Sequence, residues 1–154
     1  MFELHHLTAL EQLDWLRRGE VTPVELAEHY LARIDRLDAG LGAFATVTRE
    51  AALERAAALA GVPRAAVLWG LPVADKDLAM RAGVRTMFGS RLMADFVPET
   101  TDEIVAVMDA AGAVSLGKTN TPEFGMPSYT ESLVAPPART PWDTALGAGG
   151  SSGG

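Results

Sequence analysis

The chain has 154 residues, enough for one ordinary domain, and its 48% hydrophobic and 21% charged residues are typical of a globular protein with a buried core. The formal net charge of -7 argues against binding to a nucleic-acid backbone or to an anionic membrane surface, because both partners attract clustered Lys and Arg. The sequence contains no cysteine, which excludes disulfides, thiolate nucleophiles and Cys-based zinc sites.

The first 20 residues lack the basic region and the following apolar stretch of a secretory signal. No apolar run approaches the roughly 20 residues that a membrane span needs. We therefore expect a cytoplasmic protein without a membrane partner.

The chain opens with a predicted helix. Thr8 and Glu11 have the spacing of a capping box, in which each side chain satisfies a free backbone N–H at a helix start. Leucines then recur at helical spacing, and Gly19 is the expected stop.

A second helix is predicted more strongly. Thr22 is the expected cap, Pro23 suits the first helical position and Glu25 completes the box. Gly40 is the expected end of this helix. Residues 43–48 are short and partly β-branched, so they indicate a strand or an extended link, and the Ala-rich residues 49–60 predict a third helix.

The character of the sequence changes near Gly61, where glycines, prolines and short apolar runs favour strands and turns. Residues 71–78 predict a buried strand, and residues 81–99 predict mostly loop. Thr100 and Glu103 have capping-box spacing before a helix that ends at Gly112, and residues 113–120 predict another strand.

The order strand, helix, strand indicates an α/β layer. We expect an N-terminal helical segment over residues 1–62 and the first part of an α/β core over residues 63–154. Residues 119–154 are rich in Pro, Thr, Ser and Gly, and a loop of that length is usually functional or disordered.

Lys76 is the first candidate for chemistry, because it lies inside the apolar strand of residues 71–78. Burial lowers the pKa of a lysine in general, and a lysine that is neutral near pH 7 can act as a base. Asp75 and Asp77 flank it, but neighbouring side chains of a strand point to opposite faces. Lys76 should therefore share a face with Ala74 and Leu78. The competing interpretation is a solvated D-K-D turn.

The second candidate is "GAGGSSGG", residues 147–154. Glycines let a backbone approach other groups closely, and such a loop can aim several N–H groups at an anion or at a serine oxygen. The segment lacks the lysine of a phosphate-binding P-loop and does not fit G-x-G-x-x-G, so nucleotide binding is weakly supported. A flexible Gly/Ser linker is the competing interpretation.

"GKTNTPEFG", residues 117–125, begins in the strand predicted over residues 113–120 and continues past its end. Lys118, Thr119 and Asn120 would lie at the C-terminal end of that strand, where open α/β sheets tend to bind ligands. An ordinary turn shaped by Asn120 and Pro122 is the alternative.

The histidines are not spaced like a metal site and are expected to be structural or exposed. They are His5, His6 and His29. We expect neither a metal nor a cofactor.

Taken in order, "GLPVADKDL", "GAVSLGKTNTPEFG", "TPWD" and "GGSSGG" resemble the amidase signature family, as does the helical segment "TPVELAEHYLARIDRLDAGLGAFATV". The resemblance covers nearly the whole chain. It implies a fold with N-terminal helices followed by a large mixed β-sheet flanked by helices, of which this chain would hold the first part.

The resemblance also implies hydrolysis of a carboxamide C–N bond by a Ser–cis-Ser–Lys triad. The family's lysine base falls on Lys76, and its bridging serine, held by a cis peptide, falls on Ser151. Ser152 would support the loop at the substrate, and Gly125 and Met126 match the stretch that lines the substrate pocket.

The family's nucleophilic serine and its oxyanion-hole amides lie in a second glycine-rich segment beyond the first. This chain's last residue is Gly154, so we expect the 154 residues alone to be inactive.

Three functions remain open at this point: a stand-alone amidase of a small or hydrophobic carboxamide, the glutaminase subunit of a glutamyl-tRNA amidotransferase, and a non-catalytic fragment. The loop "TALGAGG" and the segment "EFGMPSYTES" favour the first. The expected partner is a small-molecule amide, without direct nucleic-acid binding, and the resemblance allows a homodimer of the full-length protein.

Overall fold

The computed structural model describes residues 3–154, apart from the side chain of residue 60. In this range the α-helices are α1 (Ala9–Arg18), α2 (Pro23–Leu41), α3 (Arg49–Ala57) and α4 (Glu103–Ala110). The strands are β1 (Phe44–Val47), β2 (Pro72–Lys76), β3 (Val114–Thr119), β4 (Arg139–Thr140) and β5 (Asp143–Gly147). Short 3-10 turns are η1 (Leu4–His6), η2 (Ala58–Gly61), η3 (Arg91–Met93) and η4 (Glu123–Gly125).

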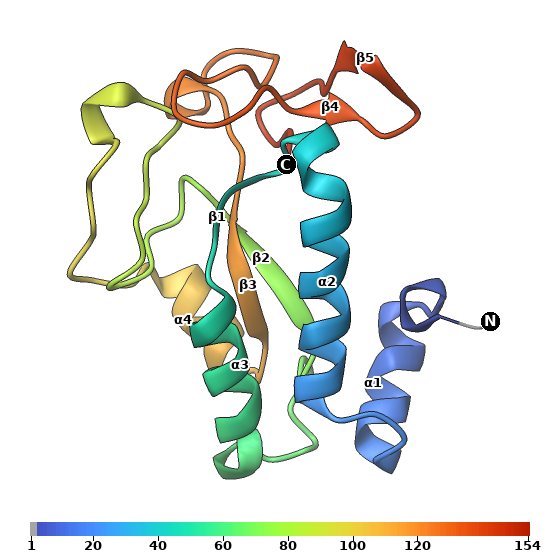
Figure 1. Ribbon diagram of the computed structural model, residues 1–154. Helices are drawn as coiled ribbons and strands as arrows, with labels where there is room; N and C mark the ends of the chain where they lie inside the picture. Colours follow the sequence, from blue (N-terminus) through green and yellow to red (C-terminus); the bar gives the residue numbers. More distant parts are fainter. Residues whose placement is uncertain (1–2) are drawn as a thin grey trace.

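Within the described residues, β1, β3 and β2 form a three-stranded sheet with β3 in the centre. β1 is antiparallel to β3, whereas β2 is parallel to it. The α2 and α3 helices lie side by side along the sheet, and the β4–β5 pair lies near the end of α2 (Figure 1). The mixed α/β architecture predicted from the sequence is confirmed.

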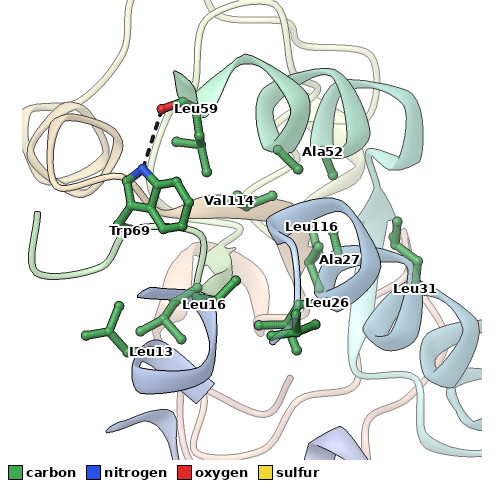
Figure 2. Packing of buried hydrophobic residues seen from close by; sticks show 13 residues of the cluster. Leu13, Leu16, Leu26, Ala27, Leu31, Ala52, Leu59, Trp69, Val114 and Leu116 are labelled. Carbon is green, nitrogen blue, oxygen red and sulfur yellow. Dashed lines mark hydrogen bonds between the residues drawn. The ribbon is translucent and has the colours of Figure 1, made fainter. Parts of the chain in front are cut away.

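One hydrophobic cluster joins the helices to the sheet. Leu26 and Leu31 of α2 are fully buried in it, and Val114 of β3 contributes from the central strand. Figure 2 shows Trp69 at its margin, with the indole Nε1–H donating to the Leu59 carbonyl at 3.4 Å. The cluster takes residues from both sides of the predicted boundary at residue 62, so the helical segment and the sheet share a core.

The first two helices begin as predicted. The Thr8 hydroxyl accepts from the Glu11 N–H while the Glu11 carboxylate accepts from the Thr8 N–H, and Thr22 and Glu25 repeat the pattern. These two boxes satisfy donors that would otherwise lack partners at each helix start.

The second helix extends beyond its predicted end, because α2 continues through Gly40 to Leu41. Gly42 takes the left-handed conformation, with φ of 60°, and its N–H donates to the Asp38 carbonyl. The Asp38 side chain then accepts from the N–H of Ala43 and Phe44, which fixes the start of β1.

The capping box expected at Thr100 is wrong. The residue that precedes α4 is Asp102, and its carboxylate accepts from the Met80 N–H at 2.8 Å. The Thr101 hydroxyl accepts from the Ala82 N–H at 3.0 Å. The side chains of Thr101 and Asp102, next to the predicted cap, therefore bond to the loop after β2 instead of capping α4.

Two strand predictions also need correction. β2 covers residues 72–76 rather than 71–78, because the chain turns after Lys76, where the Ala79 N–H donates to the Lys76 carbonyl. The β4–β5 pair was not predicted, because β4 has only two residues, β5 is exposed throughout and lacks an apolar face, and the sequence there is rich in Pro and Thr. The loop predicted over residues 81–99 is confirmed, with one 3-10 turn inside it.

Candidate functional site

The candidate site lies at the C-terminal ends of the two parallel strands. Lys76, the last residue of β2, is opposite Thr119, the last residue of β3. Asp75 is opposite Lys118 one step earlier. Two neighbouring parallel strands thus deliver their polar residues to one edge of the sheet, which is where such sheets place ligand sites.

The two aspartates flanking Lys76 point away from it, as the strand alternation predicts. Asp75 and Asp77 are buried, with 5% and 1% of their surfaces exposed, while Lys76 is only half-buried. The solvated D-K-D turn is therefore not what forms here, because both carboxylates lie inside the protein.

Lys76 reaches the glycine–serine segment across 75 residues of sequence. Its Nζ lies 3.2 Å from Ser151 Oγ and 2.9 Å from Ser152 Oγ. Both serines are exposed, so the group is open to solvent. The structure brings together the three residues that sequence reasoning selected from two distant motifs.

Backbone contacts hold the glycine–serine segment in place. The Gly150 N–H donates to the Ser128 carbonyl at 2.7 Å, and the buried Thr130 hydroxyl donates to the Gly150 carbonyl at 3.2 Å. The Thr121 hydroxyl donates to the Ser151 carbonyl at 3.3 Å. A freely solvated linker would not make such contacts, so the linker interpretation does not fit.

The last two glycines fit where a larger residue would not. A Cβ on Gly153 would overlap the Thr130 side chain, and a Cβ on Gly154 would overlap the Ala43 carbonyl. The Gly154 N–H donates to the Asn120 carbonyl at 3.2 Å. Glycine is needed here for close approach rather than for flexibility.

The cis peptide expected at Ser151 is not observed: every peptide bond in residues 3–154 is trans. A non-proline cis bond costs about 3–4 kcal/mol and persists only where dense packing offsets that cost. Ser151 is exposed, which leaves little packing to do so.

Lys118 and Asn120 are buried rather than directed at a ligand. Asn120 Nδ2 donates to the carbonyls of Gly42 and Pro136, at 2.9 and 2.7 Å. Its Oδ1 accepts from the Thr121 N–H. Asn120 therefore joins the end of α2 to the loop after β3, a longer-range role than the ordinary turn considered as the alternative for this motif.

Gly125 and Met126 lie in and directly after η4. Gly125 has φ of 71°, and a Cβ there would lie 2.7 Å from Leu78 Cδ1, in the segment that follows Lys76. Met126 is 84% exposed. Gly125 therefore borders the segment that follows Lys76. Met126, the next residue, exposes its apolar side chain to solvent.

Sequence reasoning missed a buried ionic network behind β2. Asp75 Oδ2 accepts from Arg81 Nε at 2.7 Å and from the Ser115 hydroxyl at 2.9 Å, and Arg81 also pairs with Asp109 at 2.7 Å. Burial opposes the charged guanidinium, but its bonds to the two aspartates outweigh burial and raise the pKa of Arg81. Only the alternation of charged and apolar residues in β2 hinted at this network.

The part of the chain that the structure describes contains no cluster of three His, Asp or Glu side chains that could hold a metal ion. No helix among these residues is long and apolar enough to cross a membrane.

An apolar cavity of about 200 Å³ lies between α2 and β1 and is lined partly by Tyr30, Ile34 and Phe44. Neither Lys76 nor the two serines beside it line this cavity.

The Amidase family profile matches residues 25–154. The chain belongs to the Amidase family. A glutamyl-tRNA(Gln) amidotransferase subunit from Azotobacter vinelandii is 46% identical over 155 residues, which cover 98% of this chain and 32% of that protein. The corresponding protein from Thermus thermophilus is 47% identical over 137 residues, covering 89% of this chain and 28% of that protein. The chain thus spans about a third of the length of these amidase relatives.

Solved structures agree with this assignment. A bacterial aryl acylamidase of the amidase signature family superposes with a TM-score of 0.88 at 29% identity, covering 96% of this chain and 32% of that one. The corresponding glutamyl-tRNA(Gln) amidotransferase subunit from Thermotoga maritima gives 0.78 at 34% identity, covering 99% and 32%. The amidase-signature fold expected from the sequence is confirmed.

Proposed function

We propose that this chain provides the lysine and one serine of an amide-hydrolysing site, and that the protein carrying it cleaves a carboxamide C–N bond. The observation that carries the proposal is the 3.2 Å separation of Lys76 Nζ and Ser151 Oγ, two groups from motifs 75 residues apart. Family membership supports the reaction class.

The geometry suits a proton relay. An uncharged Lys76 amine has one lone pair, which can accept the Ser151 hydroxyl proton, while its N–H groups can donate to Ser152 at 2.9 Å. Ser151 can in turn accept the proton of a nucleophilic hydroxyl, which makes that oxygen reactive toward a carbonyl carbon. Lys76 thus acts as the general base through Ser151, and Ser152 orients the amine.

The nucleophile and the oxyanion donors are assigned to a segment outside these 154 residues, because this chain covers only 32% of a relative's length. Substrate contacts are assigned to Gly125 and Met126, with Ser152 at the reacting end. We expect the isolated chain to show no amide hydrolysis, since the members of such a triad act as a unit.

The test uses the extended chain, meaning these residues joined to the downstream segment that the relatives carry. Lys76→Ala should lower kcat for a carboxamide by about 100-fold to 10,000-fold, the range typical of general acid–base catalysis. Arg91→Ala, which removes an exposed cation, is the matched control and should retain full activity. Hydrolysis that survives Lys76→Ala would remove the proposed base.

A second candidate, glutamine hydrolysis within an amidotransferase, is favoured by sequence identity. Curated amidotransferase relatives of this chain are 40–47% identical, and among the solved structures the amidotransferase subunit is 34% identical whereas the aryl acylamidase is 29% identical. Ammonia release from glutamine that appears only with the amidotransferase's other subunits would support this candidate. Hydrolysis of an aryl or alkyl amide by the extended chain alone would support the stand-alone amidase.

A further inference from the structure

A fully buried lysine lies in β3, the strand next to the one that carries Lys76. Lys118 has 0% of its surface exposed, and its partner Asp77 has 1%. Taking two charges out of water is expensive, and a buried ion pair is weak grounds for stability. Stability therefore does not account for the Lys118–Asp77 pair, whereas the chain segments that the pair holds in place can.

Lys118 ties β3 to the loop that follows β2. Its Nζ lies 3.4 Å from Asp77 Oδ1 and donates to the Ala79 carbonyl at 2.5 Å and to the Thr86 hydroxyl at 3.0 Å. One ammonium group thus contacts three points of the segment 77–86. Because this segment starts at the residue after Lys76, its position sets the direction in which β2 ends.

Asp77 is fixed from two further sides. Its Oδ2 accepts from the Met87 N–H at 3.0 Å, and its own N–H donates to the Thr119 carbonyl at 3.0 Å. Asp75, on the other side of Lys76, is fixed by Arg81 and Ser115. Both neighbours of Lys76 are therefore anchored inside the protein, which leaves Lys76 the only residue of the three that faces the serines.

The charges of the buried pair compensate one another. Burial raises the pKa of the Asp77 carboxyl and lowers the pKa of the Lys118 ammonium, and the attraction between the two groups opposes both changes. The positive charge of Arg85 acts on the Asp77 carboxyl in the same direction as Lys118. With its charge matched by Lys118, Asp77 is engaged away from Lys76, whose hydrogen-bond partners are the uncharged hydroxyls of the serines.

We propose that Lys118 is a positioning residue for the reaction: paired with Asp77, it fixes the chain immediately after Lys76 and so aims Lys76 Nζ at Ser151 and Ser152. This inference rests on the proposed function, because it assigns a role to Lys118 in the same site. Lys118 acts through Lys76 and does not contact the substrate.

The main test is the double substitution Asp77→Asn with Lys118→Met in the extended chain. It removes both charges together, so no unpaired charge stays buried, but the methionine cannot donate to Ala79 or Thr86. We expect kcat to fall about 10-fold to 100-fold, the size of effect that a displacement of about 1 Å produces, with KM changed less than about twofold. The KM should hold because the pair lies away from the substrate.

A stability-matched control separates positioning from general loosening. Leu31→Ala removes a fully buried side chain of α2 that has no contact with the Lys76 group, and it should lower the unfolding temperature without a comparable loss of kcat. A kcat loss in the double variant no larger than that of Leu31→Ala would overturn the inference.

A chemical readout makes the test independent of turnover. Lys76 and Lys118 are the only lysines of these 154 residues, and Lys118 is buried, so acylation of Lys76 by a small anhydride can be followed by peptide mass spectrometry. In the double variant the rate of Lys76 acylation should change severalfold, because the amine leaves the serine pair. An unchanged rate would count against the inference.

Thr86→Val is the second variant, in case the double variant does not fold. It removes the hydroxyl that accepts from Lys118 and keeps the shape of the side chain. We expect a smaller fall in kcat, about 3-fold to 10-fold, again with KM unchanged, and wild-type kcat would overturn the proposal. If Lys76→Ala abolishes hydrolysis while the double variant keeps wild-type kcat, only the positioning role fails; if Lys76→Ala retains hydrolysis, the proposed function fails.

Discussion

The helices at the start of the chain and the segment at its end are held in different ways. Residues 8–42 form two capped helices whose apolar faces enter a common core. Residues 119–154 contain two short strands, few buried apolar side chains and many exposed residues. The first region depends on burial and local capping, whereas the second depends on hydrogen bonds between backbone and a few buried polar side chains.

This difference shows which contacts fix the position of the glycine–serine segment. In the helices, local capping contacts set where each helix begins, and the apolar face that packs in the core stabilises it. In the C-terminal segment, Asn120 and Thr130 each bond to chain far away in sequence. Ser151 and Ser152 therefore owe their position to a small number of distant polar contacts, and four substitutions, each with a control or a pH series, can break or sharpen that contrast.

The largest effect is expected from Leu26→Ala in α2. Leu26 is fully buried in the hydrophobic cluster, so truncation removes apolar burial and leaves a cavity. We expect the free energy of unfolding to fall by about 2–5 kcal/mol in urea titrations. Leu10→Ala is the control in the adjacent helix, because Leu10 is 78% exposed and its loss should change the value by less than about 0.5 kcal/mol.

The next effect is expected from Asn120→Ala in the C-terminal region. The substitution leaves the carbonyls of Gly42 and Pro136 without their donor, which should cost about 1–3 kcal/mol of unfolding free energy. Trp142→Ala, at a side chain that is 94% exposed, should leave the urea midpoint unchanged. Equal midpoints for both variants would show that polar contacts do not hold this region.

A smaller loss is expected from Thr22→Ala at the start of α2. Removing the capping hydroxyl leaves the Glu25 N–H without its partner, and the free energy of unfolding should fall by about 1 kcal/mol. Thr100→Ala is the matched control, because local spacing assigned it a cap that does not form. A thermal melt should place Thr100→Ala within error of the unaltered chain.

The smallest effect is a pH dependence of the helical region, which holds all three histidines. His5 and His29 lie 3.0 Å apart, with the Arg33 guanidinium donating to His5 at 2.9 Å. Burial, followed by the nearby Arg33 charge, lowers the pKa of both imidazoles. The unfolded chain therefore binds more protons below about pH 6.5, so stability should fall as the pH drops through that value. His29→Gln should flatten the stability profile measured between about pH 7.5 and 5.

The helix starts could be predicted because their signals are local. Each helix start is marked by residues within a few positions of it, namely Thr8 for α1 and Thr22 with Pro23 for α2, and both helices begin there in the structure. Thr100 had the same spacing and failed, since the neighbouring Thr101 and Asp102 bond to a loop 19 to 22 residues earlier in the chain. Local spacing does not report such competitors.

The site was only partly predictable for the same reason. Strand alternation was enough to place Asp75 on the face opposite Lys76, whereas Asp77 follows the end of β2 and is held inside the protein by its bonds to Met87 and Thr119. The meeting of Lys76 with Ser151 came from family resemblance, because no spacing rule links residues 75 apart. The burial of Lys118 was not predicted, since a lysine at a strand end usually faces solvent and only its hydrogen-bond acceptors explain its position.

The contacts of Asn120 have a consequence for the order in which the chain assembles. This side chain needs Gly42 at the end of α2 and Pro136 in the following loop at the same time, so it cannot settle until both have formed. Closing the stretch between Gly42 and Asn120 costs conformational entropy. Regions held by few distant hydrogen bonds open most readily in the native state. Amide protons around Gly150 to Gly154 should therefore exchange with solvent well before those of α2, making the proposed catalytic loop the last part to form and the first to be lost.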